Sequence, residues 1–138
     1  MIQHQTILKV ADNSGAKTVK CLKVLNKLRY ANIGDCIIVS VRSLKSGRSK
    51  GNTIGGKKKR SGTIKKGQIF KALVIRTKKG ILQTSKRKHG LGISFEDNEV
   101  VLLSNQDNLI GSRIFGPITR EIRVKNYRKV MSQSKKML

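Results

Sequence analysis

The chain has 138 residues and carries 31 Lys and Arg against 7 Asp and Glu, which gives a formal net charge of +24. Hydrophobic residues make up 37%, against roughly 45–50% in typical soluble domains, so we expect one compact domain with long basic loops. With two histidines and no apolar run of membrane-spanning length, the sequence predicts neither a zinc site nor a membrane span. A polyanion relieves the self-repulsion of so many like charges, and nucleic acid is therefore the expected partner.

The first two thirds of the chain consists of short apolar runs separated by turn residues. Asp12–Gly15 and Gly34–Asp35 have the short polar side chains and glycines that favour turns. The apolar runs between such turns are 7–10, 19–25, 36–41, 69–75 and 99–103. Five short strands of this kind predict a mainly β fold, a small closed five-stranded barrel over about 1–110, because closure removes exposed strand edges.

The pattern changes to helical spacing after Gly111. Pro117 is expected in the first turn of a short helix that contains Ile118 and Ile122. A second short amphipathic helix is predicted by the spacing of Val124, Tyr127, Val130 and Met131. We expect the helical segment, about 111–132, to dock its apolar residues on the barrel and 132–138 to form a solvated tail.

The most basic part of the chain lies between Cys36 and Phe95, where sixty residues contain 17 Lys and Arg and no Asp or Glu. Within it, residues 42–66 hold five glycines and almost no apolar side chains. This segment predicts a long β-ribbon or loop that projects from the barrel and becomes ordered mainly on binding. A solvated basic face is the simpler interpretation, but without acidic neighbours phosphate contact is favoured. Arg76, Lys78 and Lys79 are expected to extend the same positive surface.

Candidate chemical motifs are weak. Residues 51–57 fit the first seven positions of a phosphate-binding P-loop, but Lys58 stands where Ser or Thr should hold magnesium. The acidic cluster at 96–99 has no partner His or nucleophile and is interpreted as a turn that balances the cations at 86–88. Cys21 and Cys36 are interpreted as buried thiols, with a disulfide or metal role as the alternative. We therefore predict no enzyme, no cofactor and no metal.

Several blocks in the chain resemble the universal large-subunit ribosomal protein family fourteen. They run in family order along nearly the whole chain: Val-Ala-Asp-Asn-Ser-Gly-Ala at 10–16, Gly-Asp at 34–35, the basic and apolar block at 65–80, and Ile-Gly-Ser-Arg-Ile-Phe-Gly-Pro-Ile-Thr-Arg-Glu at 110–121. The resemblance implies a barrel with a projecting basic ribbon, two C-terminal helices and a structural role in the large ribosomal subunit. The implied partners are large-subunit rRNA, neighbouring large-subunit proteins and small-subunit rRNA at an intersubunit bridge.

The resemblance also implies two sets of contact residues. The set expected at rRNA consists of Lys45, Arg48, Lys50, Lys57, Lys58, Lys59, Arg60, Lys65, Lys66, Arg76, Lys78 and Lys79. The set expected at protein neighbours and the bridge consists of Arg113, Phe115, Arg120 and Tyr127.

Departures from the bacterial pattern point to a compartment. The ribbon is longer and richer in Lys and Gly, residues 86–92 replace a tight hairpin turn, and the net charge is higher. These features predict a mitochondrial matrix protein, with a plastid or the bacterial cytoplasm as alternatives. A free nucleic-acid chaperone or DNA-compacting protein has the same charge and remains the alternative function.

Overall fold

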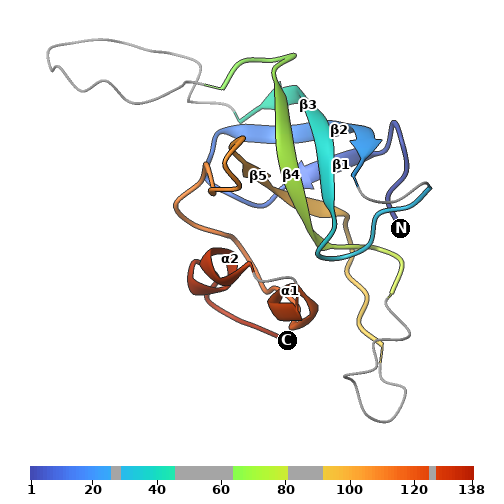
Figure 1. The fold of residues 1–138 in the computed structure, drawn as a ribbon, viewed down its shortest axis with the longest axis vertical. Coiled ribbons are helices and arrows are strands. Elements are labelled where there is room, and N and C mark those ends of the chain that lie inside the picture. The colour runs from blue at the N-terminus through green and yellow to red at the C-terminus, as the bar shows by residue number, and fades with distance from the viewer. Residues whose placement is uncertain (26–28, 46–63, 81–91, 125–126) are drawn as a thin grey trace, which may run out of the picture.

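The computed structural model of the protein describes residues 1–25, 29–45, 64–80, 92–124 and 127–138 (Figure 1). Five strands form a closed barrel in sequence order, in which β5 returns to pair in parallel with β1 while all other pairs are antiparallel. The strands are β1 (Ile7–Val10), β2 (Ala16–Val24), β3 (Cys36–Leu44), β4 (Ile69–Arg76) and β5 (Glu99–Leu103). The predicted five-stranded barrel is confirmed, although β2 begins earlier and β3 ends later than the apolar runs indicated.

One apolar core fills the barrel. Successive residues of a strand point to opposite faces, so alternate positions such as Leu8, Val19, Val39 and Leu102 enclose the interior and are fully or almost fully buried. In β1 this gives strict alternation between exposed and buried residues. The pairing between β2 and β3 contains register shifts, which bend the strands as a small barrel requires.

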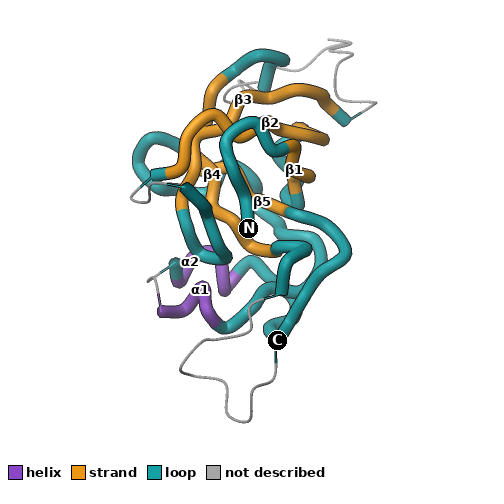
Figure 2. Tube along the Cα trace, turned by 90° about the vertical axis from the view of Figure 1, so that its right-hand side faces the viewer, coloured by secondary structure: helices purple, strands orange, loops and turns teal. Residues whose placement is uncertain are grey.

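A second apolar core lies outside the barrel, against β4 and β5. Outward residues of these strands, among them Leu73 and Val101, pack against Ile118, Ile122 and Val130 of the C-terminal segment. That segment contains the helices α1 (Glu121–Val124) and α2 (Arg128–Ser132), which lie together beside the barrel (Figure 2). The docking of the C-terminal apolar residues is therefore confirmed.

The predictions for the C-terminal segment differ from the structure in three places. The second helix was predicted to contain Val124 and Tyr127, but Val124 ends α1 and α2 begins only at Arg128. Pro117 lies before α1 rather than in its first turn, because the backbone at 117–120 takes part in other contacts. The predicted tail is exposed at 135–138, but its backbone is paired: Ile118 N–H donates to the Lys136 carbonyl at 3.0 Å, and Leu138 N–H donates to the Ile118 carbonyl at 2.8 Å. These bonds hold the tail alongside 118–120, in a parallel bridge between Ile118 and Met137.

The segment predicted to form a projecting ribbon is only partly represented in the described residues. Its first positions, 42–44, continue β3, and its last positions, 64–66, lead into the turn before β4, whereas 46–63 lie outside the described residues. Across the described ranges, no helix has the length and apolar content that crossing a membrane requires.

Candidate nucleic-acid interface

Lys65 and Lys66 are exposed on a turn at the start of β4. Gly67 follows them with a φ of 85° and donates its N–H to the Val41 carbonyl at 2.8 Å, which fixes the turn against β3. The turn is further closed by a bond from Lys65 N–H to Gln68 Oε1 at 3.0 Å. Both lysines therefore lie at the end of the barrel where β3 ends and β4 begins.

Lys78 and Lys79 are also exposed, but they follow the opposite end of β4 (Figure 1). The eight residues of β4 span about 25 Å at roughly 3.3 Å per residue. The loop is ordered by a bond from Lys78 N–H to Asn98 Oδ1 at 2.8 Å and by another from Thr77 Oγ1 to the Lys79 carbonyl at 2.9 Å. Among the described residues, the cations expected on one positive surface therefore lie in two groups, at the two ends of one strand.

Six residues of the expected rRNA set lie outside the described residues: Arg48, Lys50, Lys57, Lys58, Lys59 and Arg60. The cations at 86–88, expected to be balanced by the acidic cluster, also lie outside them. Two described acidic side chains near this region form ion pairs with other lysines: Asp97 with Lys9, and Asp107 with Lys71 at 2.6 Å.

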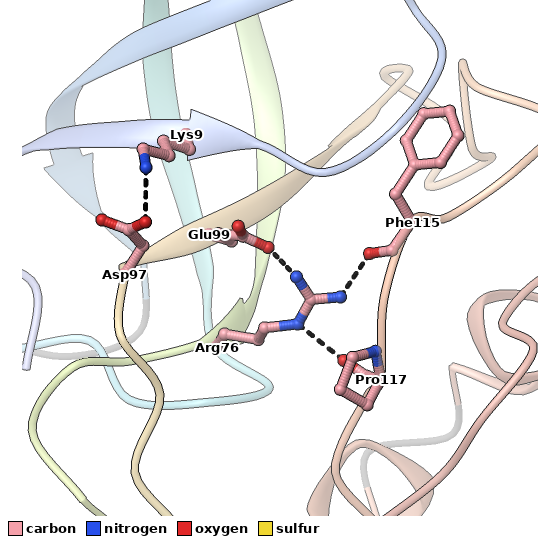
Figure 3. A network of polar contacts seen from close by, with 6 residues as sticks. All are labelled: Lys9, Arg76, Asp97, Glu99, Phe115 and Pro117. Atoms are coloured by element: carbon pink, nitrogen blue, oxygen red, sulfur yellow. Dashed lines mark hydrogen bonds and ion pairs between the residues drawn. The ribbon is translucent and has the colours of Figure 1, made fainter.

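Arg76 differs most from its expected position on the surface, because its side chain is buried with 8% of the residue exposed. Its guanidinium forms an ion pair with Glu99 and donates to the carbonyls of Phe115 and Pro117, the latter at 2.6 Å (Figure 3). Burial lowers the pKa of Arg76 from its ordinary value. Arg76 therefore ties β4 and β5 to the loop 113–117, and its guanidinium is occupied by these internal partners.

Gly116 allows the loop to approach Arg76 this closely. Its φ is +79°, a conformation that costs little only for glycine. A Cβ at this position would lie 2.5 Å from Arg76 Nη2. The guanidinium also lies 5.9 Å from the centre of the Phe95 ring, a cation–π contact from a further segment. We call Arg76, Glu99 and Gly116 the arginine clamp.

The Asp12–Gly15 turn and the loop after Gly111 form a second joint. Asn13 Oδ1 accepts the N–H groups of Ser112 at 2.8 Å and Arg113 at 3.2 Å, and Asn13 Nδ2 donates to Ser112 Oγ. Asp12 is fully buried and its carboxylate accepts N–H groups from Ser14 and Leu102. The two most recognisable blocks of the sequence, 10–16 and 110–121, therefore contact each other in the fold.

A comparison of the sequence with known families finds a match along this chain. A family model for ribosomal protein L14p/L23e matches residues 1–138. The chain belongs to the ribosomal protein L14p/L23e family. Family membership gives the protein a structural, non-enzymatic role in the large ribosomal subunit and implies rRNA and other ribosomal proteins as its partners.

In this L14p/L23e protein, Phe115 is the most exposed of the described aromatic residues, with 47% of its surface accessible. Its N–H donates to the Ala11 carbonyl at 2.8 Å, so the backbone is anchored while the ring points away from the arginine clamp (Figure 3). Lys45 Nζ lies 5.3 Å from the ring centre and donates to the Asp12 carbonyl at 2.7 Å. Lys45, expected at rRNA, is half-buried and links the end of β3 to Phe115.

The other residues expected at neighbours and the bridge occupy different environments. Arg113 and Arg120 are exposed, whereas Tyr127 is half-buried just before α2. The Tyr127 hydroxyl and the Cys36 thiol are hydrogen-bonded at 2.7 Å. Burial, followed by the contact with Cys36, raises the pKa of Tyr127 above its ordinary value of 10.0. Tyr127 therefore fastens the helical segment to β3.

Both cysteines are free thiols, and Cys21 is buried as predicted while Cys36 is only half-buried. Burial raises the pKa of the Cys21 thiol. In the part of the chain that the structure describes, no group of three His, Cys, Asp or Glu side chains is arranged to hold a metal ion. The candidate site in the described residues therefore consists of exposed cations, the exposed Phe115 ring and the hydrogen bonds of Arg76 and Asn13 that position the loop.

Proposed function

We propose that this L14p/L23e protein binds large-subunit rRNA through the cations at the ribbon end of the barrel. The described part of this set is Lys45, Lys65 and Lys66, and the ribbon residues Arg48, Lys50 and Lys57–Arg60 continue it in sequence. The observation that carries the proposal is the run of sixty residues with 17 cations and no acidic residue. Of its described cations, Lys71 and Arg76 are paired with Asp107 and Glu99, whereas Lys65 and Lys66 are exposed. Lys78 and Lys79 form a second contact at the other end of β4.

The mechanism follows from the electrostatics of RNA. Each Lys or Arg that binds a phosphate releases condensed counterions, so affinity falls steeply with salt. Double-stranded RNA has a deep, narrow major groove that side chains do not read, and its phosphates and 2′-hydroxyls are recognised by shape. A rigid barrel with basic groups at two ends, about 25 Å apart by the rise of β4, selects RNA by the spacing of its phosphate backbones.

We propose that the C-terminal segment contacts neighbouring ribosomal proteins and small-subunit rRNA at an intersubunit bridge. Arg113 and Arg120 support this because they are exposed on the loop that leads into α1. The loop is anchored by Asn13 and by the arginine clamp, so its cations are held in defined positions. Tyr127 contributes by keeping the segment docked.

We propose the mitochondrial ribosome as the location of the protein. The long, Lys- and Gly-rich ribbon and the net charge of +24 support this assignment. A plastid or bacterial ribosome is the alternative, and the experiment below distinguishes these locations.

The test is sedimentation of lysate from the source cells, with mitochondria separated from cytosol, on a magnesium-containing sucrose gradient. We expect the protein to co-migrate with the mitochondrial large subunit and to remain there at moderate salt. Co-migration with another large subunit would correct the compartment and leave the function intact. A peak at the top of the gradient, or on DNA, would contradict the function and favour a free nucleic-acid chaperone.

A further inference from the structure

The exposed ring of Phe115 stands on one of the best anchored loops of the protein. An exposed aromatic side chain on a mobile loop has no defined partner geometry, whereas one held in a fixed position is ready to bind. Here the backbone of Phe115 is bonded on both sides: its N–H donates to the Ala11 carbonyl, and its carbonyl accepts from Arg76. Neither bond involves the ring, which keeps 47% of the residue accessible.

The residues on either side of Phe115 are fixed as well. Ile114 is buried and Asp12 forms an isolated bridge with it, while Gly116 lies against the guanidinium of Arg76. The loop therefore has little freedom to withdraw the ring into the apolar core. Folding has placed an aromatic face at the surface and holds it there.

The charges around this ring favour a nucleotide over an apolar protein side chain. The ammonium group of Lys45 lies 5.3 Å from the ring centre, and the exposed Arg113 is two residues away in the chain. The hydrogen-bond partner of the Lys45 ammonium is the Asp12 main-chain carbonyl, while the Asp12 carboxylate accepts two backbone N–H groups. A nucleotide supplies both a flat base for the ring and a phosphate for the cations.

We propose that Phe115 is a stacking site for one unpaired RNA base, with Lys45 and Arg113 as contacts for the adjoining phosphates. The proposal rests on the rRNA-binding function above and adds a base-contacting residue to a surface that otherwise binds phosphates. Because described aromatic residues are few, the site takes a single base and not a run of bases. Arg76 acts as a positioning residue, which holds the loop without touching the RNA.

The chain contains no tryptophan, so Phe115→Trp introduces a single indole at the proposed site. Ile7→Trp is the matched control, because Ile7 has a similar exposed fraction, 49%, and lies on β1 away from the loop. Each full-length variant is titrated with a single-stranded oligoadenylate and with an abasic oligomer of the same length and charge. We expect the oligoadenylate to quench the fluorescence of Phe115→Trp, and the abasic oligomer to bind it without quenching.

A second variant measures the contribution of the ring to affinity. Phe115→Leu keeps an apolar side chain but removes the aromatic face, and we expect it to bind oligoadenylate about 5-fold to about 150-fold more weakly than the unaltered protein. Binding of the abasic oligomer should not change. Unchanged affinity of Phe115→Leu for oligoadenylate would overturn the proposal and would indicate that Phe115 contacts a protein.

The outcomes separate this proposal from the function on which it rests. If both oligomers bind with a steep salt dependence but quench the tryptophans at positions 7 and 115 equally, the stacking site is wrong and phosphate binding stands. If neither oligomer binds the unaltered protein at low salt, both proposals are wrong. Quenching confined to Phe115→Trp with oligoadenylate supports both.

Discussion

The neighbouring strands β1 and β5 pair in parallel, yet their outward faces differ. In β1 the outward residues Ile7 and Lys9 are exposed, and burial alternates along the strand. In β5 the outward residues Val101 and Leu103 are buried as deeply as the inward ones, because the C-terminal segment covers them. The barrel thus has one apolar core inside it, and a second apolar core where the C-terminal segment covers β4 and β5. The arginine clamp, which helps to hold the covering segment, is correspondingly partly buried, whereas the Lys9–Asp97 pair on the open side is exposed.

Two cations at the end of β4 show the same difference. Arg76 lies on the covered side, where its guanidinium has one carboxylate and two carbonyl partners. Lys78, two residues later, is exposed and only its backbone N–H is fixed. The same type of charge therefore serves internal structure in one place and is available to a ligand in the other.

The largest effect is expected from Arg76→Ala. It leaves Glu99 without its buried partner and two carbonyls without donors, and the free energy of unfolding should fall by about 3 kcal/mol or more. Urea denaturation of the free protein measures this. The matched control, Lys78→Ala, should change the free energy of unfolding by less than about 0.5 kcal/mol. Equal effects of the two substitutions would contradict the structural role assigned to Arg76.

A smaller effect is expected from Gly116→Ala, which places a Cβ against Arg76 and forces alanine into a positive φ. The conformation alone costs roughly 1–2 kcal/mol. Gly67→Ala is the control, since Gly67 has a φ of +85° and no atom within 4 Å of an added Cβ. The excess loss of stability in Gly116→Ala over Gly67→Ala therefore measures the close contact with the clamp. Equal losses would show that Arg76 moves aside easily.

The smallest effect is expected from Tyr127→Phe, and it depends on pH. Because the folded state raises the pKa of Tyr127 above 10.0, the unfolded chain loses this proton first as the pH increases. The contribution of the neutral hydroxyl is fully present below pH 10.0 and is lost as the pH rises above it toward the raised pKa. The unaltered protein should therefore lose stability faster than Tyr127→Phe above pH 10.0. Parallel pH profiles for the two proteins would contradict the assignment.

Local sequence patterns were sufficient to predict most of the barrel. The apolar runs of β1, β4 and β5 carry their own strand signal, and the helical spacing after Gly111 predicted that the C-terminal residues dock. The helix start at Pro117 was wrong because its carbonyl is taken by Arg76, a residue far away in the sequence. The paired tail was missed for the same reason, since its partners are backbone groups, which leave no mark on a sequence pattern.

The site was predictable in composition but not in arrangement. A run of cations without acidic residues predicts phosphate binding wherever it lies, but it did not predict that the described cations lie at opposite ends of β4. The burial of Arg76 was not predicted, because Glu99 is 23 positions away in the sequence and the other acceptors of the Arg76 guanidinium are main-chain carbonyls. The same holds for Phe115, whose exposure depends on the bonds that fix its backbone. Charge predicts a ligand class, and long-range contacts decide which charges meet the ligand.

The salt dependence of rRNA binding tests the central claim most directly. The affinity of the full chain for a transcript of large-subunit rRNA is measured over a range of salt concentrations, and about ten phosphate contacts predict a slope of log affinity against log salt near −7 to −9. Alanine at Lys57, Lys58, Lys59 and Arg60 should flatten the slope by roughly three to four units.

The control removes four exposed cations from the C-terminal segment instead: Arg123, Arg128, Lys129 and Lys135. We expect it to change the slope for large-subunit rRNA less than the ribbon variant does. A ribbon variant with an unchanged slope, or a control with an equal effect, would contradict the claim that the ribbon end of the barrel is where this protein holds rRNA.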